Sequence, residues 1–298
     1  MRPTIQASAF RMILLLLGIA LAGAGCSQQG ANHHADLSGA EAYASLSPHF
    51  NPDWAMDKLW EDGLAEVAIY DAERVVYNKK RTFEYTLITV KEDFNQEHNV
   101  KTDDYTRKDL FPVMKVNEFC RIPTDEYPYH YLTSLFIRRE NPLHLHKLTT
   151  SSQEWCGNTF KTITDAGDSY TLYYNSYFDG EGAGNRELPR ELLLEDQLPY
   201  TLRSLRFEDG LRFEANVLET QQTNKLGKLK VYNATVSAAK ADLSGQEAWQ
   251  VQVQLEDGKT NSYWFASQYP SQLLRQQTWD GRNLELKKLS RYAYWQTE

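Results

Sequence analysis

Residues 249–295 read WQVQVQLEDGKTNSYWFASQYPSQLLRQQTWDGRNLELKKLSRYAYW, and the fold prediction rests on this stretch. Large apolar residues at positions 249, 251, 253 and 255 alternate with glutamines, which is the pattern of a strand with one buried face and one solvated face. Asp257-Gly258 tolerates the positive φ angles of a tight turn, so residues 261–266 (NSYWFA) are expected to return as a second, aromatic-rich strand. The stretch therefore predicts an antiparallel hairpin.

The same pattern recurs along the whole chain. Residues 272–278 lead through Asp280-Gly281 into another alternating segment, and three more Asp-Gly pairs, beginning at positions 62, 179 and 209, adjoin strand-like runs. Further strand candidates are residues 64–77, 82–94, 110–122, 127–139, 143–160, 170–178, 211–219 and 228–240. Because no regular alternation of strands with helices is visible, the sequence predicts a mainly β fold. It would be a single antiparallel curved sheet or half-barrel, built as a meander, with one or two covering helices.

Two segments carry helix signals. Asn51-Pro52 matches the cap and first position of a short helix that ends before Gly63 and packs Trp54 and Trp60 against the sheet. Residues 188–207 (LPRELLLEDQLPYTLRSLRF) give the only substantial helical pattern inside the domain.

A break in the second helix is expected at Pro199, which lacks a backbone N–H. The Gly-rich residues 179–185 in front of it predict a flexible loop. We therefore expect a broken helix that covers an apolar groove of the sheet as a lid.

The N-terminus reads as an export signal. Arg2 and Arg11 form a basic region, and residues 12–22 (MILLLLGIALA) are an apolar run too short to span a bilayer. Residues 21–26 (LAGAGC) resemble the lipobox of bacterial lipoproteins, in which the cysteine, here Cys26, is acylated with fatty acids such as palmitate. Gly23 stands where such boxes usually have a large aliphatic residue, so an ordinary secretory signal cleaved nearby is the alternative.

The chain divides into three parts. Residues 1–25 are the predicted lipoprotein signal peptide, residues 26–50 are a polar stretch predicted to be a flexible tether, and residues 51–298 are predicted to form a single β-rich domain. Ser27 matches the outer-membrane sorting pattern, which predicts an anchor in the outer membrane and a domain in the periplasm. The only membrane contact expected is the lipid.

Composition argues against nucleic acid as a partner. The formal net charge of the chain is −8, and removal of residues 1–25 deletes Arg2 and Arg11 without any acid, which gives −10. A phosphate-binding surface needs a concentrated basic stripe, whereas the basic run at residues 79–81 falls at an expected hairpin tip. No phosphate loop or other cofactor motif is present, so no cofactor is expected.

Cys120 and Cys156 have three possible interpretations. In an oxidising compartment Cys120 and Cys156 are expected to form a disulfide, although two inert thiols are the alternative. Cys156 as a nucleophile is a third reading, but the sequence positions no histidine to activate it. No other catalytic motif is visible, so the sequence does not predict an enzyme.

A weak metal signal comes from three histidines. His144 and His146 are two positions apart on an expected strand and would project from one face, with His130 on the preceding strand. Because no carboxylate or cysteine follows at a fixed spacing, a solvated strand face is the favoured reading, and no metal is predicted.

Several stretches resemble a group of uncharacterised Gram-negative lipoproteins. They are EVAIYDAERVVY (residues 66–77), EDF (92–94), SSQEWCGNTF (151–160), YWF (263–265) and YPSQLLRQQTWDGRNLELKK (269–288), followed by YW (294–295). The resemblance spans about residues 60–295 and implies an outer-membrane lipoprotein. Some members carry a septum-formation-inhibitor label, but the pyrophosphatase chemistry of that label needs a phosphate loop and an acidic metal site that this sequence lacks.

Two functions follow from these observations. The first is a non-enzymatic binder or carrier whose aromatic-rich sheet encloses an apolar ligand. The second is a structural or interaction lipoprotein with a closed core and no small-molecule ligand. An apolar cavity would favour the first function, and a filled core would favour the second.

Overall fold

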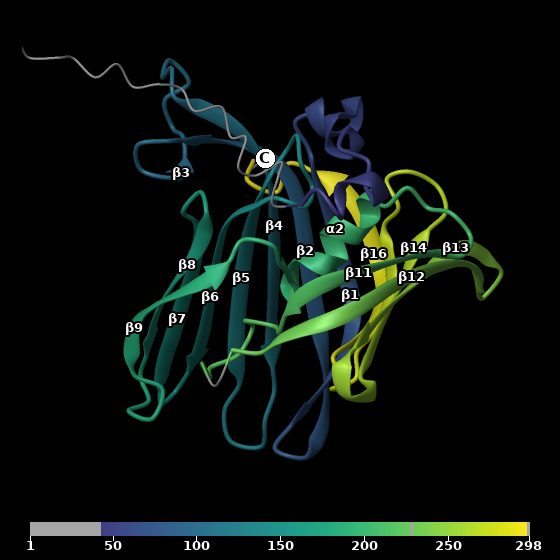
Figure 1. Ribbon diagram of the computed structural model, residues 1–298. Coiled ribbons are helices and arrows are strands. Elements are labelled where there is room, and N and C mark those ends of the chain that lie inside the picture. Colours follow the sequence, from purple (N-terminus) through teal and green to yellow (C-terminus); the bar gives the residue numbers. More distant parts are fainter. Residues whose placement is uncertain (1–42, 227–228, 297–298) are drawn as a thin grey trace, which may run out of the picture. The chain divides into compact units, whose positions relative to one another are not determined.

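The alternating segments of the sequence join in one sheet (Figure 1). The computed structural model of the chain describes residues 43–226 and 229–296. Its strands are β1 (Ala65–Val76), β2 (Lys79–Asn95), β3 (Val100–Lys101), β4 (Leu110–Ile122), β5 (Tyr129–Arg138), β6 (Leu145–Glu154), β7 (Gly157–Asp165), β8 (Ser169–Ser176), β9 (Ala183–Pro189), β10 (Leu193–Leu194), β11 (Leu211–Leu218), β12 (Val231–Leu243), β13 (Gln246–Leu255), β14 (Thr260–Ala266), β15 (Leu273–Gln277) and β16 (Asn283–Tyr292).

Helical structure in the described residues is confined to short turns. The 3-10 helices are η1 (Ser47–His49), η2 (Trp54–Met56), η3 (Lys58–Glu61), η4 (Glu195–Gln197), η5 (Leu202–Ser204) and η6 (Glu256–Gly258), and the α-helix is α2 (Leu198–Thr201). None of these helices is long and apolar enough to cross a membrane.

The strands follow one another round an open sheet. Their order is β10-β11-β12-β13-β14-β15-β16-β1-β2-β4-β5-β6-β7-β8-β9, and β3 pairs with β2 outside this path. Neighbours are antiparallel except for the short parallel pair β10–β11. Turn chemistry sets the register: Tyr77 and Asn78 both have positive φ (53° and 58°), as a two-residue hairpin turn between β1 and β2 requires.

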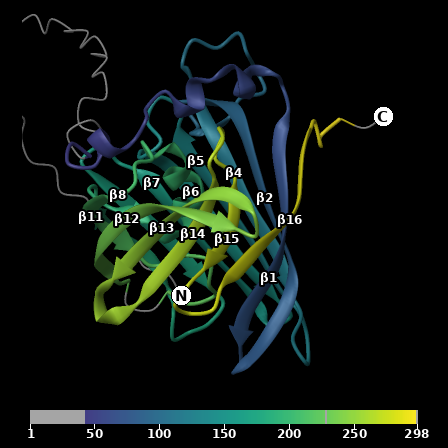
Figure 2. The same cartoon turned by 90° about the vertical axis from the view of Figure 1, so that its right-hand side faces the viewer.

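The sheet curves around a single shared core. The main cluster of buried apolar side chains includes Tyr70 of β1, Leu172 of β8, Phe265 of β14 and Leu284 of β16. Because one cluster draws on strands from both halves of the order, the sheet must bend most of the way into a barrel, as Figure 2 shows from the side. The predicted fold class, a single curved and mainly antiparallel sheet, is confirmed.

The predicted lid is instead a plug inside the barrel. The plug segment, residues 192–205, contains η4, α2 and η5, and every one of its residues is buried. Its polar side chains, such as those of Gln197 and Arg203, are buried together with its leucines, so no face of the segment is left to solvent. Pro199 lies in the first turn of α2, where a missing N–H costs nothing, and so does not break the helix. Arg203 of the plug fixes it to the wall through a buried ion pair with Glu66 of β1, at 2.7 Å.

The expected helix after Asn51-Pro52 forms only as the two 3-10 turns η2 and η3. Asp57 separates them because its backbone is extended (ψ 151°), and its carboxylate accepts a hydrogen bond from the backbone N–H of Leu59 at 2.8 Å. Trp54 and Trp60 are buried as expected, with ring centroids 5.4 Å apart.

The predicted tether is shorter than residues 26–50. Tyr43, Leu46 and Phe50 are buried, and the Tyr43 hydroxyl lies 2.8 Å from that of Tyr170 on β8. On the other side, His49 stacks on Phe213 of β11 with centroids 4.4 Å apart. Residues 43–50 are therefore part of the fold and pack across the seam of the open sheet, which is the gap between its end strands β9 and β10. Cys26 and residues 27–42 lie outside the described part of the chain.

Two strand boundaries also differ from the prediction. Residues 143–160 form two strands, β6 and β7, because the chain turns at Trp155 and Cys156 and Glu154 pairs with Gly157. The predicted Gly-rich loop ends early, since Ala183 already pairs with Asn175 as the start of β9. Small residues are acceptable there because β9 is an edge strand with only one neighbour.

Candidate functional site

A polar pocket opens at the end of the barrel where β1 turns into β2. This mouth pocket has a volume of about 400 Å³ and is lined from β1, β7, η4, the β11–β12 connection and the β15–β16 turn. Antiparallel pairing brings these elements together: Asn283 at the start of β16 pairs with Glu73, so the turn before β16 lies beside the end of β1.

Lys161 of β7 lines the mouth pocket and has no ion-pair partner within the described ranges 43–226 and 229–296. Its residue is only 1% exposed, and Nζ donates hydrogen bonds to the carbonyl oxygens of Gln221 (3.2 Å) and Lys225 (2.7 Å). Burial lowers the pKa of Lys161 to about 8, while Asp196 acts on it only at longer range. The ammonium group is therefore held by neutral acceptors alone.

Arg74 of β1 is the second basic group of this kind. Its Nη2 donates to the carbonyl oxygen of Gln222 at 3.1 Å, and its guanidinium lies over the ring of Tyr131, 5.1 Å from the centroid. Nη1 is buried and has no hydrogen-bond partner within the described chain. The Oε1 atom of Gln221, a lining residue that is 1% exposed, also has none. Each of these two buried atoms therefore lacks a hydrogen-bond partner within the described chain.

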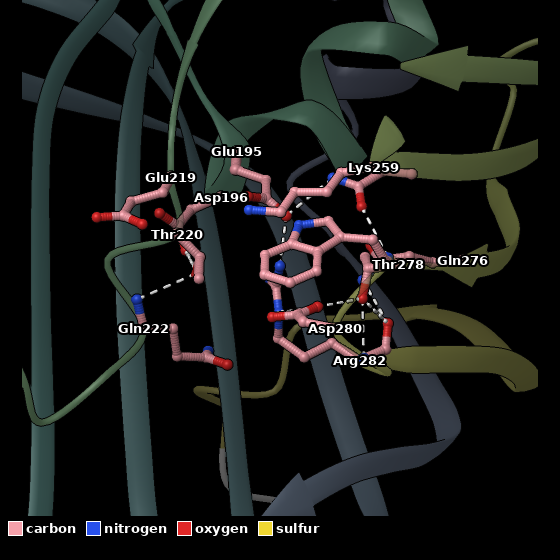
Figure 3. A network of polar contacts seen from close by, with 12 residues as sticks. Glu195, Asp196, Glu219, Thr220, Gln222, Lys259, Gln276, Thr278, Asp280 and Arg282 are labelled. Carbon is pink, nitrogen blue, oxygen red and sulfur yellow. Dashed lines mark hydrogen bonds and ion pairs between the residues drawn. The ribbon is translucent and has the colours of Figure 1, made fainter. Parts of the chain in front are cut away.

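Two of the acidic side chains around the pocket, Glu195 and Asp280, share one cationic partner. Arg282 donates from Nε to Asp280 at 2.8 Å and from Nη2 to Glu195, so it lies between two carboxylates (Figure 3). Burial raises the pKa of Glu195, with Arg282 acting in the opposite direction. Burial also acts to raise the pKa of Asp280, but Arg282 outweighs it and the pKa is lowered.

The remaining acids accept hydrogen bonds from the β11–β12 connection. Asp196 accepts from the Thr220 hydroxyl at 2.6 Å and from the backbone N–H of Gln221 at 2.7 Å. Glu219 accepts from the backbone N–H of Lys230 at 3.1 Å. Figure 3 shows this connection passing beside η4 at the pocket. Asp196 and Glu219, like Lys161 and Arg74, therefore have neutral hydrogen-bond partners.

Glu118 of β4 lies deeper, beside a space of only about 40 Å³ that adjoins the mouth pocket. The Tyr85 hydroxyl donates to its Oε2 at 2.7 Å, and its Oε1 has no partner. Burial, reinforced by the negative charge of Asp196, raises the pKa of Glu118 to about 8. At neutral pH this carboxyl is predominantly protonated.

The apolar interior of the barrel is filled by the protein itself. The plug segment and the inward-facing side chains of the sheet form one continuous cluster. The spaces found on the inner side, at the mouth pocket and beside Glu118, have Arg74, Glu195 and Arg282 among their lining residues. The plug segment therefore fills the place where the apolar groove was expected, and the spaces that remain have charged residues in their lining.

The predicted disulfide between Cys120 and Cys156 is absent, and both thiols are unpaired. Cys120 is in register with Tyr131 and then Ser152, so two strand spacings, ~10 Å, separate β4 from β6. Cys156 lies four residues beyond Ser152, which adds roughly 13 Å along the strand direction. A disulfide requires Cα atoms within about 7 Å. Cys120 is buried, and Cys156 is exposed beside the Tyr127 hydroxyl, 3.0 Å away.

The three candidate histidines do not converge. His144 Nε2 lies 2.6 Å from Asp165 Oδ2 and 2.7 Å from Arg190 Nη2. His146 instead contacts Asn99, because a bulge in β6 interrupts the alternation, and burial lowers its pKa to about 4. His130 is exposed on β5. Among the described residues, no group of three His, Cys, Asp or Glu is placed to bind a metal.

The sequence interpretation did not single out Arg74, Glu118 or Lys161. A signal for them does exist: each takes an inward position in the alternation of its strand, where the neighbours two residues away are apolar or small. Lys161 lies between the buried Thr159 and Ile163, and Glu118 lies between the buried Val116 and Cys120. A charge in the buried register of a strand is costly unless it has a partner or a function.

Comparisons with known proteins name no activity. No protein-family model and no curated protein sequence matches the chain. It is similar to a β-barrel-like protein of the domain of unknown function DUF1849 from Brucella abortus, with 10% identity and a TM-score of 0.46 over 77% of this chain and 98% of that one. It is also similar to a DUF1089 family protein from Pseudomonas aeruginosa, with 15% identity and a TM-score of 0.34 over 54% and 82%.

Proposed function

We propose that this chain is a non-enzymatic binding protein of the cell envelope that holds a small organic acid in the mouth pocket. The proposal rests on which charged side chains of the pocket have a partner of opposite charge. Among the described residues, Arg74 and Lys161 line the pocket without a carboxylate partner, whereas Glu195 and Asp280 share Arg282 as an ion-pair partner. An anion would supply the missing partner.

The energetics support a ligand over a purely structural role for these cations. A buried charge that lacks a partner destabilises a fold, and hydrogen bonds between charged groups each contribute about 1.5–3 kcal/mol. The pocket volume of about 400 Å³ falls within the range of small-molecule sites, about 300–1,000 Å³.

The predicted apolar carrier is supported less well than an anion binder, since the plug segment already occupies the apolar interior. The closed-core alternative, an interaction lipoprotein without any small ligand, remains the competing function. The test below separates it from the proposal.

Calorimetry at low ionic strength with inorganic phosphate and citrate would test the pocket. We expect saturable binding that Arg74→Gln weakens about 10- to 100-fold, because a charge-assisted hydrogen bond is lost. Arg275→Gln is the matched control: Arg275 pairs with Glu285 on the outer face and does not line the mouth pocket. Equal affinities in the two variants, or no saturable binding of either anion, would favour the closed-core function.

We also propose that the protein is anchored to the outer membrane through acylated Cys26, facing the periplasm. The support is the basic region, the apolar run of residues 12–22 and the lipobox-like residues 21–26. In a Gram-negative host, Cys26→Ala should move the protein from the membrane pellet to the soluble periplasmic fraction. A Cys26→Ala protein that is exported and still pellets with outer membranes would show that the anchor lies elsewhere.

A further inference from the structure

A cluster of aromatic side chains adjoins the mouth pocket and extends from the edge of the core to the surface. This aromatic rim consists of Tyr77, Tyr127, Tyr129, Trp155 and Tyr177. It comes from the β1–β2, β4–β5, β6–β7 and β8–β9 connections and the start of β5. Alternate connections of an antiparallel meander lie at the same end, so the rim and the pocket share one end of the barrel, the lower end in Figure 1.

Three members of the rim are unusually exposed for their residue types. Trp155 is 80% exposed, Tyr77 is 68% exposed and Tyr177 is 63% exposed. Trp155 nevertheless has a fixed orientation, because it stacks on Tyr127 with centroids 5.6 Å apart and planes 15° from parallel. Tyr177 lies against Gly157, where a Cβ atom would come within 2.4 Å of the tyrosine ring. The backbone of Gly157 leaves room for this ring.

Direct contacts connect the rim to the mouth pocket. Tyr127 packs on Tyr129 (5.8 Å), Tyr129 packs on Tyr131 (6.3 Å), and Tyr131 underlies the pocket residue Arg74. On the same side, Asn224 of the β11–β12 connection donates to Glu154, the residue before Trp155, at 2.9 Å. The outer aromatic surface and the inner cationic surface are therefore neighbouring parts of one end of the molecule.

We propose that the ligand is an acidic saccharide, whose acid group enters the mouth pocket while further sugar rings lie on the aromatic rim. This inference rests on the proposed anion-binding function and assigns its ligand class. The C–H bonds on one face of a sugar ring pack against the negative face of an aromatic ring. Within the pocket, the carboxylate would pair with the basic lining residues, and sugar hydroxyls would form hydrogen bonds with polar ones such as Thr220 and Thr223.

Charge favours a saccharide over an anionic lipid surface at this end. Each cation of the basic hairpin tip beside the rim already has an acidic partner, because Lys79 and Arg81 pair with Asp125, at 2.6 and 2.8 Å, and Lys80 pairs with Glu73 at 2.7 Å. Glu154 adds a further carboxylate next to Trp155. The available positive charge is inside the pocket, where a single acid group can reach it and a flat membrane cannot.

The test uses the soluble Cys26→Ala protein and calorimetry with galacturonic acid, its linear trimer, and maltotriose as a neutral trimer. We expect the acidic trimer to bind at least about tenfold more tightly than the monomer, and maltotriose to bind most weakly. Trp155→Ala should weaken the trimer about five- to tenfold and leave the monomer unchanged, since one stacking contact is lost. Trp295→Ala, which removes an exposed tryptophan outside the rim, is the matched control.

The outcomes separate this inference from the proposed function. If phosphate and galacturonate bind through Arg74 but the trimer gains nothing and Trp155→Ala has no effect, the saccharide is refuted while the anion pocket stands. If the trimer binds and depends on Trp155 but not on Arg74, the anion pocket is refuted. Phospholipid vesicles that bind through Trp155, with no binding of the trimer, would overturn the inference in favour of a lipid surface.

Discussion

Replacement of Glu118 by glutamine is expected to remove a loss of stability that the wild-type protein undergoes between pH 5 and pH 8. Burial and the charge of Asp196 raise the pKa of Glu118 from 4.5 to about 8. Between these two values the folded state binds a proton that the unfolded state has released. Stability is therefore fully present below the unfolded-state pKa and falls as the pH rises through the folded-state pKa.

The size of the effect follows from the two pKa values. Each unit of difference corresponds to 1.36 kcal/mol, so the shift from 4.5 to about 8 sets an upper limit of about 5 kcal/mol at pH 8. Glutamine keeps the shape and can still accept the hydrogen bond from Tyr85, but it never acquires the charge. We expect Glu118→Gln to match the wild type near pH 5 and to exceed it by roughly 2–5 kcal/mol at pH 8.

Urea unfolding at pH 5, 6.5 and 8 measures this difference directly. Glu126→Gln is the control, because Glu126 is exposed on the β4–β5 connection. The series stops at pH 8 because Lys161, whose pKa burial lowers to about 8, adds stability as the pH rises further. A wild-type protein whose stability does not fall between pH 5 and 8 more steeply than that of Glu118→Gln would refute the reasoning.

Three further outcomes are expected. Arg203→Met should cost about 3–5 kcal/mol by leaving Glu66 buried and unpaired, and an unchanged urea midpoint would contradict this. Tyr43→Ala should cost about 3–5 kcal/mol, because the side chain is buried at the seam. A native-state maleimide should label Cys156 and not Cys120, with no change in Tm on reduction; a disulfide found in the non-reduced protein would contradict the unpaired thiols.

The fold class and most strands could be predicted from local patterns in the sequence. Period-two alternation and Asp-Gly turns are local signals, so they placed β1, β2, β4 and the hairpins near the C-terminus without tertiary information. The predicted strand boundaries were wrong where the local signals were ambiguous. A two-residue turn without glycine or proline, at Trp155 and Cys156, merged two strands into one.

Only the tertiary structure decided the plug, the cysteines and the pocket. A leucine-rich helix that covers a sheet and one that fills a barrel have the same local pattern, and the difference arises from how far the sheet curves. Disulfide geometry depends on which strands are neighbours, and β5 stands between Cys120 and the β6–β7 turn. Arg74 and Lys161 are far apart in sequence, and the closing of the sheet brings both to one pocket. Charge neutralisation is a property of distances in space, so whether these cations are paired could not be read from the order of residues.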